Sequence, residues 1–197
     1  MRMILITLLV ILTAFIKMFG QNVYTVKSVK ATIQGTSNLH DWESDINKIE
    51  CKGSFIVQGN TLKAVKNVEV RIPVQGIKSR EGHLMDEKTF EAFKSDQFPY
   101  IICTVKQANV VTDANQNVTI TATGSLTMAG VTLPVTLSAK GKVLPNGDLQ
   151  IAFSKMLDME TFKMKPPTAV LGTIKVGAEV TVVFDLLLSS TKPVPKS

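Results

Sequence analysis

The 197-residue chain contains few of the residues that carry enzyme chemistry, with two histidines, two cysteines and one tryptophan. It has no G-x-S-x-G elbow, no phosphate-binding glycine loop and no H-E-x-x-H or C-x-x-C pattern. A metal site would have to draw on His40, Asp41 and His83, and their spacing does not support one. We therefore predict a protein that is not an enzyme, with no catalytic residue, no metal site and no cofactor.

Clusters of one charge and long apolar segments are also scarce. The 22 basic and 16 acidic residues are scattered along the chain, so a nucleic-acid partner is not expected. After residue 20, no segment approaches the roughly 20 apolar residues of a transmembrane helix. The mature chain should therefore contain no stable membrane span.

The first 20 residues have the composition of a secretory signal peptide. Arg2 precedes an uncharged apolar run over residues 4–16, and the small residue Gly20 stands before Gln21. We predict cleavage after Gly20 and a periplasmic or secreted protein. An uncleaved N-terminal anchor is the alternative interpretation.

The rest of the chain contains no linker, repeat or low-complexity tract that would divide it. We predict one domain over residues 21–188, followed by a flexible tail over residues 189–197 that is rich in proline, lysine and serine. The sequence does not determine the oligomeric state, and a homodimer remains open.

Two neighbouring segments alternate strictly between apolar and polar residues, which is the period of a β-strand with one buried face. They span residues 117–128 and 131–143 and are separated only by Ala129-Gly130. Two long strands with so short a connection predict an antiparallel hairpin.

Weaker alternation predicts strands over most of the remaining domain. They begin near residues 23, 40, 62, 100, 149 and 174, with Pro73 at a strand end and Asn146-Gly147 as a hairpin turn. Long strands and tight turns favour an all-β fold, a closed antiparallel β-barrel, over the alternative of a two-sheet sandwich.

One segment departs from this pattern and predicts a short helix over about residues 86–94. Asp86 is a suitable N-cap, Phe90 and Phe93 share an apolar stripe with Leu84 or Met85, and Pro99 follows the helix. The aromatic face of this helix should be buried at the mouth of the barrel or on its flank.

A barrel of this size is either filled by its own side chains or holds one small ligand. Small residues fall on the inward-facing register and would leave space there, and these are Ala122, Gly124, Ala139, Gly141 and Ala178. Alternatively, the glycines mark bends that a curved barrel needs.

Cys51 and Cys103 fall on predicted strands and are interpreted as buried free thiols, although export leaves a disulfide between them open.

Four motifs, in this order, resemble the YceI-like family of secreted bacterial proteins. They are Gly35-Thr36-Ser37-Asn38-Leu39-His40-Asp41-Trp42; Ile77-Lys78-Ser79-Arg80 with His83-Leu84-Met85-Asp86, Phe90 and Phe98-Pro99; Leu126 to Leu137; and Pro166-Pro167-Thr168-Ala169-Val170-Leu171-Gly172-Thr173-Ile174-Lys175. Arg80-Glu81-Gly82 departs from the family's usual Arg-Asp before His-Leu.

The resemblance implies a lipocalin-like, eight-stranded antiparallel β-barrel that holds a long polyisoprenoid, such as a quinone tail or a prenyl phosphate, in its lumen. Transport, storage or sequestration of that lipid would be the function. A structural or interaction protein with a filled barrel is the alternative. Ligand-contacting residues at the mouth and in the lumen would be Trp42, Leu84, Met85, Phe90, Phe93, Phe98, Ala122, Gly124, Ala139 and Phe153.

Overall fold

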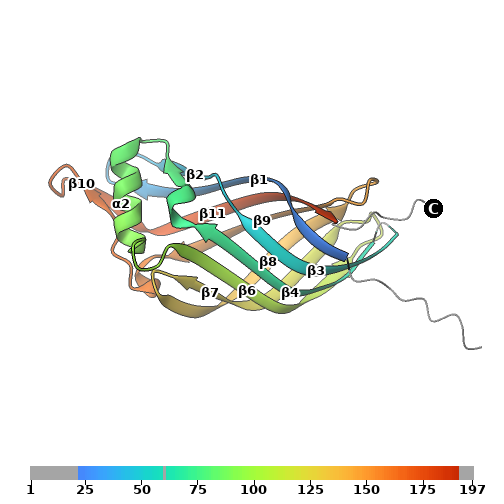
Figure 1. Ribbon diagram of the computed structural model, residues 1–197. Coiled ribbons are helices and arrows are strands. Elements are labelled where there is room, and N and C mark those ends of the chain that lie inside the picture. Colours follow the sequence, from blue (N-terminus) through green and yellow to red (C-terminus); the bar gives the residue numbers. More distant parts are fainter. Residues whose placement is uncertain (1–21, 60, 191–197) are drawn as a thin grey trace, which may run out of the picture.

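The computed structural model describes residues 22–59 and 61–190, and this part of the chain is an antiparallel barrel with one α-helix across its end (Figure 1). The expected signal peptide and residues 191–197 of the expected tail lie outside the described residues. The strands are β1 (Asn22–Ser37), β2 (Trp42–Ile46), β3 (Glu50–Gln58), β4 (Thr61–Pro73), β5 (Ile77–Ser79), β6 (Tyr100–Thr112), β7 (Val118–Met128), β8 (Val131–Val143), β9 (Leu149–Asp158), β10 (Thr168–Ala169) and β11 (Ile174–Ser190).

Eight of these strands close into a ring, in the spatial order β1-β3-β4-β6-β7-β8-β9-β11 and back to β1. Toward one end of the barrel, β2 replaces β3 as the neighbour of β1, and β5 pairs with β2. The expected lipocalin-like all-β barrel is thus confirmed, and the sequence pattern did not reveal the short additional strands β5 and β10.

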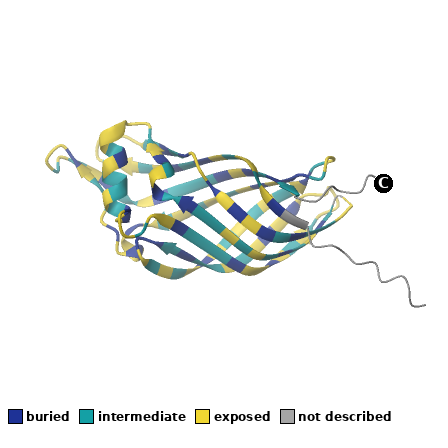
Figure 2. Ribbon diagram, in the orientation of Figure 1, coloured by how far each residue is buried: buried dark blue, intermediate teal, exposed yellow. Residues whose placement is uncertain are grey.

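The β7–β8 hairpin has the register that the alternation predicted. Val118 pairs with Gly141 at one end and Met128 with Val131 at the other, with no irregularity between them. Ala129 and Gly130 turn the chain with positive φ values of 48° and 80°, as a two-residue hairpin turn requires. Buried and exposed residues therefore alternate along the strands (Figure 2).

The ring is not hydrogen-bonded evenly all the way round. β8 and β9 pair at only four positions next to their connecting turn. These begin where Lys140 pairs with Ala152 and end where Val143 pairs with Leu149. Beyond these pairs, the Val131–Ala139 segment of β8 keeps only β7 as a partner, and the Phe153–Asp158 segment of β9 keeps only β11. We call this separation the β8–β9 seam. Pro134, which has no N–H to donate, lies in the separated part of β8.

The helix α2 (His83–Phe93) begins three residues earlier than the sequence suggested, and the expected N-cap role of Asp86 is wrong. Gly82 is the N-cap, and Asp86 lies in the first helical turn. Its carboxylate instead accepts a hydrogen bond from the Ser79 amide at 2.7 Å and pairs with Lys78 Nζ at 3.2 Å. Both contacts hold the helix against β5, which was not visible in the sequence.

Candidate functional site

An apolar cavity of about 230 Å³ runs inside the barrel, between the helix α2 and the opposite end. All eight barrel strands contribute to its wall, and Thr89, Ala92 and Phe93 of α2 line it as well. Among the lining residues, only Ser44, Thr89 and Lys155 carry a hydroxyl or an ammonium group. The lumen is thus hollow, and its wall is almost entirely hydrocarbon.

The end of the barrel away from α2 is sealed by large buried side chains. Tyr24 packs edge-on against Phe55, with ring centroids 5.3 Å apart, and its hydroxyl donates to the Gly147 carbonyl at 3.1 Å. The fully buried residues at this end also include Leu62, Val118, Leu149 and Leu188. Among the described residues, these side chains therefore close the lumen at this end.

A polar cluster fixes the same end from outside. Asp148, in the β8–β9 turn, accepts hydrogen bonds from Lys27 Nζ at 2.7 Å and from the Ser189 hydroxyl at 2.6 Å. These donors, the lysine foremost, hold the pKa of the Asp148 carboxyl below its usual value. The cluster joins β1 and β11 to the turn that closes the lumen.

The α2 end has a lighter cover. Phe93 is buried, while Phe90 is half-buried and lies under Lys78, whose ammonium is 4.9 Å from the ring centroid. Leu84, by contrast, is 55% exposed at the start of the helix. A single short helix, packed on β5 and β10 (Figure 1), is thus the main barrier between the lumen and solvent here.

Trp42, the single tryptophan, stands at the edge of this end and lines the cavity. It is the cross-strand partner of Gly35, and its ring occupies the place that a β-carbon on Gly35 would take. Its indole Nε1 donates to the Thr36 carbonyl at 3.0 Å. The ring is therefore fixed with one side toward the lumen.

Two thiols lie on the wall of the lumen. Cys51 and Cys103 are both free, and each pairs with Val70 from opposite sides, on β3 and on β6. Two strand spacings, about 10 Å, separate their backbones, which is too far for a disulfide. Burial, and then the neighbouring Cys103, raises the pKa of the Cys51 thiol to about 11.

The structure places five of the expected ligand-contacting residues on the cavity wall, namely Trp42, Phe93, Ala122, Ala139 and Phe153. Met85 and Phe90 pack on the surrounding core without reaching the wall. Phe98 lies against Gly130 at the β7–β8 turn. Leu84 and Phe98 therefore lie outside the site.

Gly124 does not widen the lumen. A β-carbon there would collide with the Thr104 carbonyl oxygen of β6, next to an irregularity in the β6–β7 register between Thr104 and Ala108. Gly124 instead lets the backbones of β6 and β7 approach closely at a bend. This agrees with the alternative interpretation of the glycines, in which they mark bends of a curved barrel. The space in the lumen comes instead from alanines such as Ala122 and Ala139.

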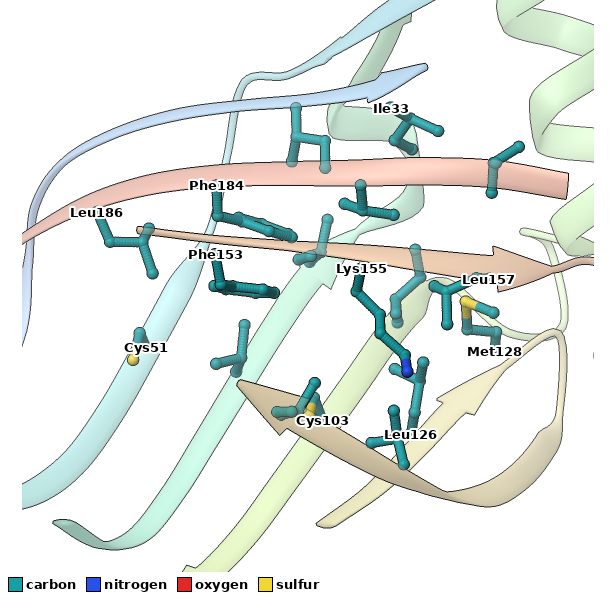
Figure 3. Close-up of a pocket in the computed structure, with 18 of the residues that line it drawn as sticks. Ile33, Cys51, Cys103, Leu126, Met128, Phe153, Lys155, Leu157, Phe184 and Leu186 are labelled. Carbon is teal, nitrogen blue, oxygen red and sulfur yellow. The ribbon is translucent and has the colours of Figure 1, made fainter. Parts of the chain in front are cut away.

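Several wall residues were not singled out from the sequence. Phe184 stacks on Phe153, and Lys155 lies two residues further along β9 (Figure 3). The signal for Lys155 was present, because Leu149, Ile151, Phe153, Lys155 and Leu157 share one parity. A lysine at that parity must face the same side as its apolar neighbours.

Within the described ranges, no group of three or more His, Cys, Asp or Glu side chains is arranged to hold a metal ion. His40 contacts Glu81 at 3.8 Å, and His83 contacts Glu87 at 3.5 Å, both on exposed surface. None of the helices in the described residues has the length and apolar character needed to cross a membrane.

Comparison with known proteins identifies one matching family and several solved structures with a similar fold. The model of the YceI-like domain matches residues 21–188. No curated protein matches the chain.

Among solved structures, a polyisoprenoid-binding domain from Saccharophagus degradans superposes with a TM-score of 0.66 at 8% identity, over 87% of this chain and 99% of that one. BcnA of Burkholderia cenocepacia superposes with a TM-score of 0.60 at 13% identity, over 82% of this chain and 96% of that one. The YCEI protein of Campylobacter jejuni superposes with a TM-score of 0.56 at 17% identity, over 76% of this chain and 84% of that one. At these identities the likeness concerns the fold.

Proposed function

Because this chain belongs to the YceI-like domain family, we propose that it binds a long apolar lipid, such as a polyisoprenoid, in the lumen of its barrel. Transport, storage or sequestration of that lipid is the function that such binding would serve. The observation that carries the proposal is the cavity, which is closed at one end, covered by a short helix at the other and walled by hydrocarbon.

Physical chemistry supports an apolar guest over water. A cavity of about 150 Å³ with an aliphatic and aromatic lining stays dry and accepts benzene, and this lumen is larger. Each methylene group transferred from water into such a wall contributes about 0.8 kcal/mol. A chain of several isoprene units would thus bind tightly through its hydrocarbon alone.

The solved relative described as polyisoprenoid-binding supports the choice of lipid class. The same proposal makes the protein a carrier rather than an enzyme, since the cavity wall brings together no acid–base pair or nucleophile–base pair. It also places the protein outside the cytoplasm, on the basis of the charged and then apolar composition of residues 1–20.

Mass spectrometry of lipids extracted from the purified full-length protein tests the proposal. We expect a long-chain apolar lipid in near-stoichiometric amount, and the mass of the intact chain will show whether the first 20 residues are removed. Repeated recovery of protein without lipid, followed by no uptake of added geranylgeraniol, would contradict lipid binding and favour a purely structural barrel.

Trp42 supplies the readout for uptake, because it is the single tryptophan and lies on the cavity wall. Addition of geranylgeraniol to delipidated protein should shift its emission to shorter wavelength with saturation. Ala122→Leu, which fills the lumen, is the matched variant in which this shift should be weakened.

A further inference from the structure

Lys155 is the one basic residue on the wall of the described cavity. It projects from β9 into the lumen, between Phe153 and Leu157 on the same face of the strand, and its nitrogen points toward the side formed by Leu126 (Figure 3). Its cross-strand neighbour on β11 is the apolar Val182. The ammonium group therefore lies among hydrocarbon side chains.

No partner in the described part of the chain neutralises this ammonium. The salt bridges and side-chain hydrogen bonds of that part do not include Lys155, and no aspartate or glutamate lines the cavity. The other ionisable side chains on the wall are the thiols of Cys51 and Cys103, whose pKa values are raised by burial, so that they are neutral at pH 7.

A charge in a nonpolar setting is unfavourable unless it is paired, and charged groups that remain in such places in folded proteins have partners. The surrounding protein does not supply one for Lys155, so a bound molecule is the available source. A carboxylate or phosphate oxygen is the partner that an ammonium group prefers.

We propose that the lumen binds a single-chain lipid with an anionic head group, and that this head group pairs with Lys155 while the chain extends toward the sealed end. The proposal rests on the proposed lipid-binding function and narrows its ligand to acidic amphiphiles. The small side chains Ala108, Ala122 and Ala139 line the cavity and leave room for the chain. The head group then lies near the β8–β9 seam and the α2 end, where it can enter last.

The test uses delipidated full-length protein and two matched pairs of probes, with Trp42 emission or calorimetry as the readout. Palmitate is compared with hexadecanol, and geranylgeranyl phosphate with geranylgeraniol, so that carboxylate, phosphate and uncharged ends are separated. We expect each acidic probe to bind at least about tenfold more tightly than its neutral partner, because hydrogen bonds between charged groups are stronger than those between neutral groups.

Lys155→Met keeps an unbranched side chain, one heavy atom shorter than lysine, and removes the charge. It should abolish the preference for the acidic probes and leave binding of the neutral probes unchanged or stronger. Lys140→Met, on the exposed face of β8, is the control and should behave like the original protein. If Lys155→Met does not fold, Lys155→Gln serves in its place.

The outcomes separate this proposal from the one on which it rests. Equal binding of acidic and neutral probes by the original protein, or an unchanged preference in Lys155→Met, would overturn the anionic ligand while leaving lipid binding intact. Failure of the original protein to bind any of the four probes would contradict lipid binding itself.

Discussion

Phe153 and Phe184 are direct cross-strand partners on β9 and β11, and their rings stack inside the lumen with centroids 4.6 Å apart and planes 15° apart (Figure 3). Both rings line the cavity. Because they are large and lie parallel on the same part of the wall, they set the width of the lumen there.

Truncation of each ring to alanine should affect the free energy of unfolding and the size of the ligand that the lumen accepts to different extents. Phe184 is buried, whereas Phe153 is half-buried, so Phe184→Ala should lower the free energy of unfolding by about 4 kcal/mol and Phe153→Ala by about 2 kcal/mol. Urea denaturation measures both values. Phe153→Ala should also accept a bulkier apolar probe. A larger loss for Phe153→Ala than for Phe184→Ala would contradict this order.

Ala122 and Gly124 are two residues apart on β7 and should respond differently to added volume. Gly124→Ala places a methyl group against the Thr104 carbonyl oxygen, and no rotamer change relieves contact with backbone. We expect a loss of about 2 kcal/mol in unfolding free energy, with lipid uptake retained by the folded fraction.

Ala122→Leu, by contrast, adds its carbons to open space. It should cost about 1 kcal/mol or less and reduce uptake of geranylgeraniol, which thermal denaturation and Trp42 emission measure separately. If Gly124→Ala were as stable as the original protein, the close approach of β6 and β7 would be disproved.

Asp148 should make the protein sensitive to acid. Its pKa is lowered in the folded state, chiefly by the hydrogen bond from Lys27, so it stabilises the fold above the unfolded-state pKa of about 3.9. That contribution is lost as the pH falls through the lower, folded-state pKa. Asp148→Asn should cost about 2 kcal/mol at pH 7 and flatten the acid limb of the stability profile. Asp96→Asn, on exposed surface, is the control and should leave the profile unchanged.

The lumen thiols should be unreactive in the folded protein. The Cys51 pKa of about 11 keeps that thiol protonated at pH 8, and burial shields it from reagents, while burial also raises the pKa of the half-buried Cys103. Mass spectrometry after maleimide treatment should therefore find little labelling in native protein and two labelled thiols in urea. Because the pKa of Cys51 is raised in the folded state, the contribution of this protonated thiol to the free energy of unfolding should be fully present below about pH 9. It should be lost as the pH rises toward 11. Rapid native labelling of both thiols at pH 8 would argue against the closed lumen.

The strands were predictable because alternation is a local signal. Residues 118–143 show this best, since each inward residue pairs with another inward residue across the hairpin. β5 and β10 were not predictable, since strands of three and two residues are too short to show alternation, and β5 exists only through pairing with the more distant β2. Asp86 was misread for a similar reason: its partner is the amide of Ser79, which belongs to one of those strands.

The site was predictable in its side chains but not in its shape. Parity on β7, β8 and β9 identified Ala122, Ala139 and Phe153, and the same parity applied to Lys155 would have shown a charge in the lumen. Gly124 could not be judged, because its role depends on a neighbouring backbone rather than on its own strand. Pro134 was an unused signal, since proline within a strand indicates an edge, and the β8–β9 seam is such an edge.

Pro134 also bears on how separate molecules meet. An open strand edge is a template for pairing with an edge of another chain, and such pairing leads to aggregation. The separated part of β8 is such an edge within an otherwise closed ring, and a proline there interrupts the row of amide donors that an incoming strand would need. Pro134, which lies in the unpaired part of the barrel wall, should thus also disfavour the addition of strands from one copy of the protein to the next.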